Sequence, residues 1–186
     1  MRSKVITVTL VVIWLVAGLA QADTIGLYAD IGGTNCNIEL QPNLTYIHVV
    51  HVTDGAMGCK FMAPRPECLT GAIFVCDQVV VPPPACGCGD SQTGMTFEYG
   101  SCKSGAIEIL RMVYRRGLDM DPCCAYPLLP YPDSPGGQLL VTDCESNEVP
   151  AIGLVATVQG NSSCPCGYPV PVEETTWGSV KALFGE

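Results

Sequence analysis

The sequence predicts an all-β protein, a disulfide-stapled β-sandwich of about eight strands with a short C-terminal helical tail. Between residues 23 and 170, short apolar runs alternate with Gly, Pro, Asn and Asp, and no long stretch has helical periodicity. All twelve cysteines lie after residue 35, behind an N-terminus with the features of a secretory signal. These observations indicate an exported domain whose short strands are cross-linked by disulfides.

The N-terminal segment, residues 1–22, is predicted to be a signal peptide. Arg2 and Lys4 supply a basic n-region, and the largely apolar run Val5–Leu19 is too short to span a bilayer. Residues 20–22, Ala-Gln-Ala, form a cleavage site of the A-x-A type. We therefore expect a secreted protein, extracellular or periplasmic, whose mature chain begins at Asp23.

Eight segments are predicted as strands because their apolar residues recur with a period of two or form short buried runs. In chain order they are Thr24–Ala29, Thr45–Val52, Gly58–Met62, Ala72–Val81, Met95–Tyr99, Ala106–Tyr114, Gln138–Thr142 and Ile152–Val158. In the segment Ala106–Tyr114, apolar residues occupy both alternating sets, and Ile107 and Val113 are expected on the same face. This segment is therefore predicted to lie near the centre of the sheet, buried on both sides.

The tail, residues 169–186, is expected to lie outside a β-sandwich domain that covers residues 23–168. Thr176 is a suitable cap for a short helix in which Trp177, Val180 and Phe184 form one apolar stripe. No cysteine follows Cys166, so no disulfide ties the tail to the domain. We expect the tail to be dispensable for folding and its stripe to be recognised by another protein. The alternative is that Trp177 packs into a groove of the sandwich.

Composition excludes several classes of partner. Removing the signal peptide takes away two basic residues and no acidic ones, which changes the net charge from −9 to −11. Such a charge argues against nucleic acid and anionic membrane surfaces. The mature chain contains no apolar run of the roughly 20 residues needed to span a bilayer. A protein or carbohydrate partner outside the cytoplasm is therefore expected.

The cysteines are candidates for disulfides, and their even number suggests complete pairing. They are Cys36, Cys59, Cys68, Cys76, Cys86, Cys88, Cys102, Cys123, Cys124, Cys144, Cys164 and Cys166. Because a ring between neighbours strains the peptide bond, Cys123 and Cys124 are expected to pair with distant partners. The C-x-C pairs at 86/88 and 164/166 leave a zinc site as the alternative, but exported thiols favour disulfides.

The candidate chemical motifs have simpler structural interpretations. Residues 30–35, Asp-Ile-Gly-Gly-Thr-Asn, resemble the phosphate-binding turn of sugar kinases with the actin-like ATPase fold, but a Gly-Gly turn between strands is the favoured interpretation and no ATP binding is expected. His48 and His51 are three residues apart on a predicted strand and therefore face opposite sides. No cofactor is expected, although loop carboxylates could hold calcium. These carboxylates are Asp119, Asp121, Asp133, Asp143, Glu145 and Glu148.

Two resemblances accompany these observations. The segments Gly26–Asp30, Tyr46–Val52 and Gly58–Phe61 resemble the opening strands of cohesin-like sandwiches. The segment Val172–Phe184 resembles the VExxTWGxxKxLY-type tails of uncharacterised cysteine-rich secreted bacterial proteins, with Phe184 in place of the usual Tyr. The resemblances imply a bacterial exported sandwich and bring no catalytic residues with them.

The sequence thus favours a non-enzymatic binding or structural module of the cell envelope or extracellular space. One alternative is a secreted hydrolase that uses acidic residues such as Asp119, Asp121 or Glu108, although no carboxylate pair lies in a recognisable constellation. The other is a protease-resistant inhibitor that presents the proline-rich segment Pro82–Cys88. A flat exposed apolar or aromatic patch would favour binding, and a cleft with two buried carboxylates would favour catalysis.

Overall fold

The computed structural model describes residues 23–81, 86–117, 120–159 and 164–169, and the side chains of residues 86–88 lie outside this description. The predicted signal peptide and most of the predicted tail, including Trp177, Val180 and Phe184, also lie outside it. Among the described residues, no helix is long and apolar enough to cross a membrane.

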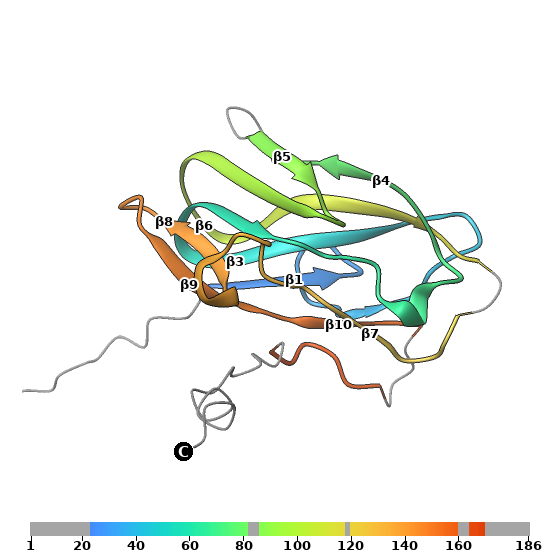
Figure 1. Ribbon diagram of the computed structural model, residues 1–186. Coiled ribbons are helices and arrows are strands. Elements are labelled where there is room, and N and C mark those ends of the chain that lie inside the picture. Colours follow the sequence, from blue (N-terminus) through green and yellow to red (C-terminus); the bar gives the residue numbers. More distant parts are fainter. Residues whose placement is uncertain (1–22, 82–85, 118–119, 160–163, 170–186) are drawn as a thin grey trace, which may run out of the picture.

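Ten strands and two short turns of 3-10 type build the described part of the chain (Figure 1). The strands are β1 Thr24–Tyr28, β2 Asn37–Ile38, β3 Leu44–Phe61, β4 Ile73–Val79, β5 Cys86–Asp90, β6 Gly94–Arg115, β7 Cys124–Pro127, β8 Leu139–Asp143, β9 Glu148–Gly153 and β10 Val155–Val158. The turns are η1 Glu67–Leu69 and η2 Pro135–Gly137. The predicted all-β sandwich class is confirmed.

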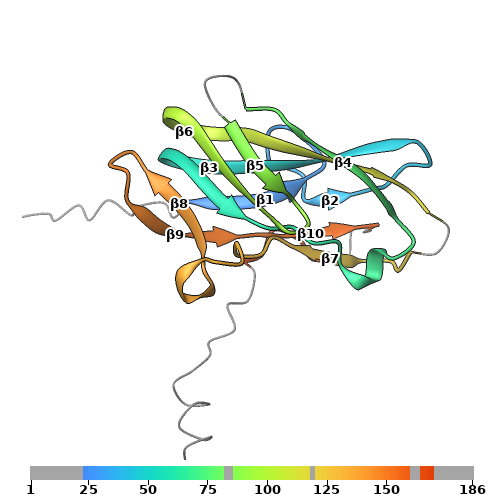
Figure 2. The same cartoon turned by 45° about the horizontal axis from the view of Figure 1, so that its top comes forward.

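The strands form two layers (Figures 1 and 2). The larger sheet has the order β1-β9-β8-β3-β6-β4, with β5 also paired to β6 and β1 also paired to β3. The smaller sheet has the order β2-β10-β7. The first half of β3 lies between β1 and β6, and its second half lies between β8 and β6. β3 and β6 are therefore the central pair of strands in the larger sheet, and each has neighbours on its other side along most of its length.

Aromatic side chains fill the space between the layers. Phe61 and Phe97 stack with ring centroids 5.6 Å apart, and Tyr114 meets Tyr126 edge to face at 6.3 Å. The hydroxyl oxygens of these two tyrosines are 2.9 Å apart, and the Tyr126 hydroxyl donates to the carbonyl of Ala63 at 2.7 Å. Both hydroxyl groups are thus buried with hydrogen-bond partners, as a stable core requires.

Four disulfides connect segments that are distant in sequence. They join Cys36 to Cys166, Cys68 to Cys124, Cys102 to Cys144 and Cys123 to Cys164. The adjacent cysteines 123 and 124 do pair with separate distant partners, which fixes β7 to η1 on one side and to the segment after β10 on the other. Three of the disulfides therefore reinforce the smaller sheet, which has only short strands, and Cys102–Cys144 joins β6 to the β8–β9 turn of the larger sheet.

The predicted strands differ from the observed ones in three ways. Two predicted pairs merge into single long strands, β3 and β6, which bend at register shifts instead of ending. The segment Ile152–Val158 is divided between β9 and β10. The short strands β2, β5 and β7 were not predicted, because each is too short or too rich in Cys, Gly and Pro to show a period of two.

Candidate binding face

Strands β3, β6 and β4 lie side by side and present one outward face of the larger sheet. Antiparallel partners place their side chains on the same face, so the register defines three rows across the strands. We call this surface the β4 face; its rows are Leu44–Arg115–Ile73, Tyr46–Val113–Cys76 and His48–Arg111–Gln78. Its first two rows are mainly apolar, and its third row is polar.

Large apolar side chains are exposed on this face. Leu44 is 53% exposed, Tyr46 is 43% exposed and Ile73 is 54% exposed. Val75, at the register shift of β4, is 48% exposed. Four of the eight large apolar residues that are exposed in the described chain therefore belong to this face or its margin. Exposed large apolar residues gathered on one face are characteristic of interaction sites, and Val113 between them on β6 is buried.

A network of charged groups forms the polar row. The Glu108 carboxylate accepts hydrogen bonds from Arg111 Nε at 2.7 Å and from an Arg111 terminal nitrogen at 2.9 Å. His48 Nδ1 lies 2.5 Å from the same carboxylate. Although partial burial raises the pKa of Glu108, the hydrogen bonds from Arg111 and His48 outweigh it and hold this pKa below its usual value. Glu108 is therefore a fixed anion that orders the neighbouring cation and imidazole.

This network depends on a bulge in β6. Val49 pairs with Leu110 and Val50 pairs with Glu108, so Ile109 is an extra residue. Without it, Glu108 and Arg111, three residues apart, would point to opposite sides of the sheet. The bulge also places Ile107 and Val113 on opposite faces, contrary to the prediction that they share one.

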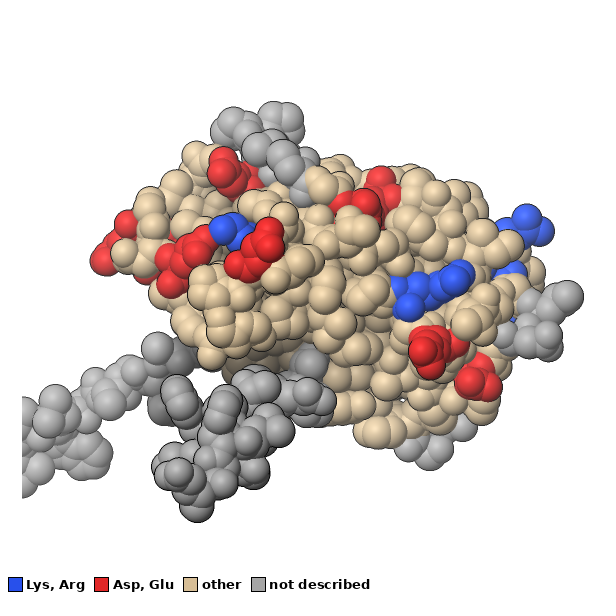
Figure 3. Space-filling model, in the orientation of Figure 1, with Lys and Arg blue, Asp and Glu red and all other residues tan. Residues whose placement is uncertain are grey.

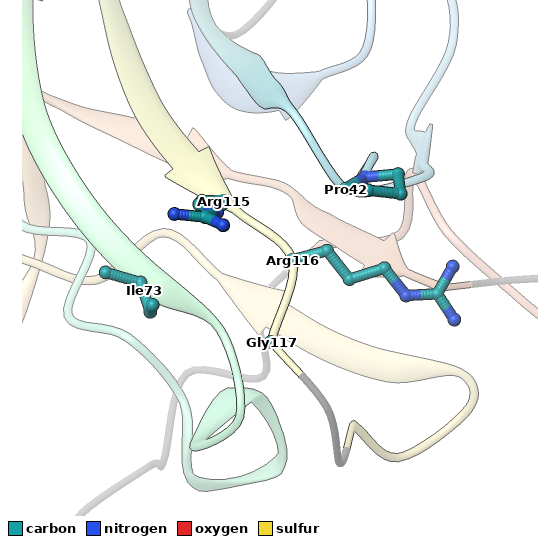
Figure 4. Close-up of a pocket in the computed structure, with 5 residues that line it drawn as sticks. All are labelled: Pro42, Ile73, Arg115, Arg116 and Gly117. Atoms are coloured by element: carbon teal, nitrogen blue, oxygen red, sulfur yellow. The ribbon is translucent and has the colours of Figure 1, made fainter.

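A hollow of about 480 Å³ lies at the end of the β4 face (Figure 4). Ile73 and Arg115 border it on neighbouring strands, and Pro42 lies across from them on the segment that leads into β3. Arg116 and Gly117, which follow β6, complete the wall. An ideal Cβ on Gly117 would lie 1.2 Å from the carbonyl oxygen of Gly71, so two backbones touch here and only glycine fits. The hollow thus combines apolar walls with two guanidinium groups.

Charge is distributed unevenly over the molecule. In Figure 3 most basic patches lie in the right-hand half, towards the end of β6, with acidic patches just below them, and one small basic patch lies among the carboxylates on the left. The left-hand end carries β8 and β9, and the Lys60–Glu148 ion pair joins β3 to β9 there. The hollow therefore lies at the end where most of the basic patches of this view are found.

The predicted acidic candidates do not come together. Glu108 is held by Arg111 and His48, Asp121 is exposed on the segment before β7, and Asp119 lies outside the described residues. Among the calcium candidates, Asp143 instead orders the β8–β9 turn, where it accepts from the backbone N–H groups of Glu145 and Asn147. In the described part of the chain, no group of three or more His, Cys, Asp or Glu residues could hold a metal ion.

The prediction of complete cysteine pairing is wrong at two positions. Cys59 is buried and unpaired, and Cys76 is exposed and unpaired on the β4 face. Both lie on strands that pair regularly with neighbours carrying no cysteine opposite them. Cys164 and Cys166 belong to two different disulfides, so this C-x-C pair cannot supply zinc thiolates. The side chains of Cys86 and Cys88, and much of the segment Pro82–Cys88, lie outside the description.

The remaining sequence motifs have structural roles. Asp30 accepts hydrogen bonds from the backbone N–H groups of Gly32, Thr34 and Asn35 and from the Thr34 hydroxyl, so residues 30–35 form a self-contained turn after β1. Although burial alone raises the pKa of Asp30, these hydrogen bonds lower it below its usual value. His48 and His51 have different surroundings, since His51 is fully buried and bonds the Tyr99 hydroxyl at 2.7 Å.

Comparisons with known proteins identify the fold. No family model and no curated protein matches the chain. Among solved structures, the sixth cohesin of scaffoldin B from Acetivibrio cellulolyticus, solved in complex with a Cel5 dockerin, has a TM-score of 0.50 and 9% identity and covers 75% of this chain and 99% of its own. The chain therefore has a cohesin-like β-sandwich fold, as the opening strands had suggested.

Two further cohesins resemble the chain more weakly. A non-cellulosomal cohesin from Archaeoglobus fulgidus has a TM-score of 0.46 and 11% identity, and covers 85% of this chain and 97% of its own. A cohesin module from a family 33 glycoside hydrolase of Clostridium perfringens has a TM-score of 0.48 and 5% identity, and covers 75% and 98%.

Proposed function

We propose that this protein is an exported, non-enzymatic module that binds another protein through the β4 face. The observation that carries the proposal is the exposed apolar surface of Leu44, Tyr46 and Ile73 on a rigid sheet, bordered by the Glu108–Arg111 network. Exposed apolar side chains gain free energy only when a partner covers them, at roughly 25 cal/mol per Å² of apolar area. An apolar centre with a polar margin is the usual anatomy of a protein-binding surface.

Two other observations support this function. One solved neighbour, the Acetivibrio cellulolyticus cohesin, forms a complex with a dockerin, so the same sandwich serves protein binding elsewhere. Four disulfides are expected in a protein that folds in an oxidising compartment, in agreement with the predicted signal peptide. A protein partner is favoured over a carbohydrate because Tyr46 is the one aromatic among the exposed large apolar residues of the face.

The test is a comparison of capture by three versions of the immobilised mature chain from envelope and culture-fluid extracts of the source organism. Wild type and Tyr46→Glu differ at the centre of the face. The matched control is Ile152→Glu, which places the same charge on an exposed apolar residue of β9. We expect a protein that is retained by wild type and by Ile152→Glu, and lost with Tyr46→Glu.

Equal retention by all three versions would exclude the β4 face as the binding surface. If soluble glycans release the captured protein from the immobilised chain, while the amount of immobilised chain stays the same, the ligand is instead a carbohydrate. Equal melting temperatures of the three versions, which their exposed positions predict, are required for either conclusion.

A further inference from the structure

Two adjacent arginines at the hollow have no carboxylate partner among the described residues. Arg115 and Arg116 are both exposed, whereas the described ion pairs of Lys60 and Arg111 satisfy those two cations with Glu148 and Glu108. The chain as a whole has eighteen acidic and nine basic residues, so two neighbouring cations without a carboxylate partner among the described residues stand out. Guanidinium groups bind carboxylates well, often through two hydrogen bonds, so this pair suits an acidic ligand.

The walls of the hollow also favour a ligand with an apolar group. Ile73 and Pro42 form its walls, and the direct backbone contact between Gly71 and Gly117 makes one side of it rigid. Its volume of about 480 Å³ is enough for one large side chain. The ligand should therefore carry carboxylates close in sequence to an aromatic or large aliphatic residue.

The chain itself contains such a sequence beyond the described residues. Glu173 and Glu174 are adjacent, and Trp177 follows three residues later. We propose that the C-terminal tail of a second copy of this chain binds the hollow, with Glu173 and Glu174 at Arg115 and Arg116 and Trp177 between the apolar walls. The two adjacent carboxylates match the two arginines in number and in sign, and the Arg115 and Arg116 side chains point in different directions (Figure 4).

The direction of the chain favours a second copy over the same molecule. Gly167 donates to Val155 and Pro169 bridges to Leu154, so the last described residues lie at the start of β10. The hollow lies beyond the other end of β10, where the Gln159 side chain donates to the Leu40 carbonyl and Arg116 donates to Gln41. In Figure 1 the red segment accordingly runs away from the end of β6.

The length of the tail also favours binding to a second copy. Trp177 follows Pro169 by eight residues, which span at most about 29 Å when fully extended. To reach the hollow of its own molecule, the tail would have to run back along the length of β10, whereas the tail of another molecule meets no such constraint. A tail at one end and an acceptor at the other end form a head-to-tail contact, which builds rings or open chains of molecules.

Purified mature protein tests the inference without any other partner. Trp177 is the only tryptophan after the predicted cleavage site, since the other is Trp14, so its fluorescence reports directly on the tail. We expect the sedimentation mass to increase with protein concentration while the emission of Trp177 moves to shorter wavelength. The double variant Arg115→Glu/Arg116→Glu should weaken self-association about tenfold or more, and the exposed control Lys103→Glu should not.

A charge exchange separates pairing from general repulsion. The variant Glu173→Arg/Glu174→Arg should also lose self-association, and an equimolar mixture of the two reversed variants should regain it. Blue-shifted emission from a monomer at all concentrations would show that the hollow binds its own tail. A monomer with fully solvated Trp177, or self-association that survives both reversals, would overturn the inference.

The inference rests on the proposed function because Ile73 and Arg115 of the β4 face line the hollow. Either proposal can nevertheless be contradicted while the other one holds. Capture of another protein that depends on Tyr46, together with a strictly monomeric purified chain, would leave the proposed function in place and exclude self-assembly through the tail.

Discussion

Burial changes the pKa of His51 strongly, and this change falls in the mildly acidic pH range. This side chain is fully buried, its Nδ1 bonds the Tyr99 hydroxyl, and its Nε2 has no hydrogen-bond partner among the described atoms. Burial lowers the pKa of His51 from 6.5 to about 4, against the smaller opposing effect of Asp23, whose carboxylate lies 3.8 Å away. The folded protein therefore holds this imidazole neutral at pH values where the unfolded chain protonates it.

This difference predicts an acid sensitivity. Above pH 6.5 His51 is neutral in both states and contributes nothing; between pH 6.5 and about 4 the unfolded state binds the extra proton, so stability falls with pH. The loss amounts to about 3 kcal/mol by pH 4. Urea unfolding of wild type and His51→Gln at several pH values measures it, and His48→Gln serves as the control. An unchanged slope in His51→Gln would contradict the assignment.

Burial, which lowers the pKa of His51, also makes the two unpaired cysteines differ in reactivity. Burial raises the pKa of Cys59 to about 12, despite the hydrogen bond from the Tyr99 hydroxyl, which lies 3.3 Å from the sulfur. A thiol must ionise to react, so Cys59 is inert in the folded state. Cys76 is exposed on β4 and has no such protection.

Alkylation of the native purified protein should therefore modify Cys76 and spare Cys59. After unfolding without reductant, both should react. Peptide mapping by mass spectrometry identifies each site, and the eight cysteines in the four disulfides are internal controls. Recovery of Cys76 in a disulfide-linked peptide would show that it pairs with another cysteine in the exported protein.

At the scale of elements, the long strands β3 and β6 were predictable only in pieces. Alternating residues such as Met95, Phe97 and Tyr99 identified the strand, and their burial confirms the inward set. The bulge at Ile109 was not predictable, because a bulge adds a residue without altering local composition. The prediction that Ile107 and Val113 share a face was wrong because of this bulge. For the same reason, the contact between Glu108 and Arg111 could not be predicted from the sequence.

Gly58 illustrates how closely β3 and β6 approach. An ideal Cβ on Gly58 would lie 2.3 Å from the backbone oxygen of Phe97. Gly58→Ala should therefore force the strands apart and cost about 3 kcal/mol. Gly105 provides the control because its φ of +89° strains an alanine although nothing lies within 4 Å, so Gly105→Ala should cost only about 1–2 kcal/mol.

Urea unfolding midpoints at constant slope measure both changes. Equal losses for the two variants would mean that the close approach at position 58 costs no more than the strained backbone at position 105, contrary to the prediction. A larger loss at position 58 would establish the close contact between the two central strands.

At the scale of the whole molecule, the sequence predicted the class of fold and the use of disulfides but not the proposed binding surface. The exposed residues Leu44, Tyr46 and Ile73 belong to segments far apart in the chain, and only the strand order β3-β6-β4 unites them. Connectivity of the cysteines was likewise open, because it depends on which loops the sandwich brings together. Cys36 and Cys166 meet only after β2 and β10 have paired.

The Cys36–Cys166 disulfide closes the largest loop in the molecule that the described residues define. Its sequence separation is 130, compared with 41 for Cys123–Cys164. In the chain-entropy treatment, a cross-link stabilises by restricting the unfolded chain, and the effect grows with the logarithm of loop length. When each is the only cross-link in the chain, the disulfide that closes the larger loop should therefore stabilise by about 1 kcal/mol more than the one that closes the smaller loop.

Two variants test this expectation, each retaining one of these two disulfides and carrying serine at all other cysteines. We expect urea unfolding at neutral pH to show that the variant retaining Cys36–Cys166 is about 1 kcal/mol more stable than the variant retaining Cys123–Cys164. The reverse order would mean that the shorter cross-link, which anchors β7 and the segment after β10, acts mainly by holding the native smaller sheet together. Loop entropy would then be the lesser contribution to the stability of this sandwich.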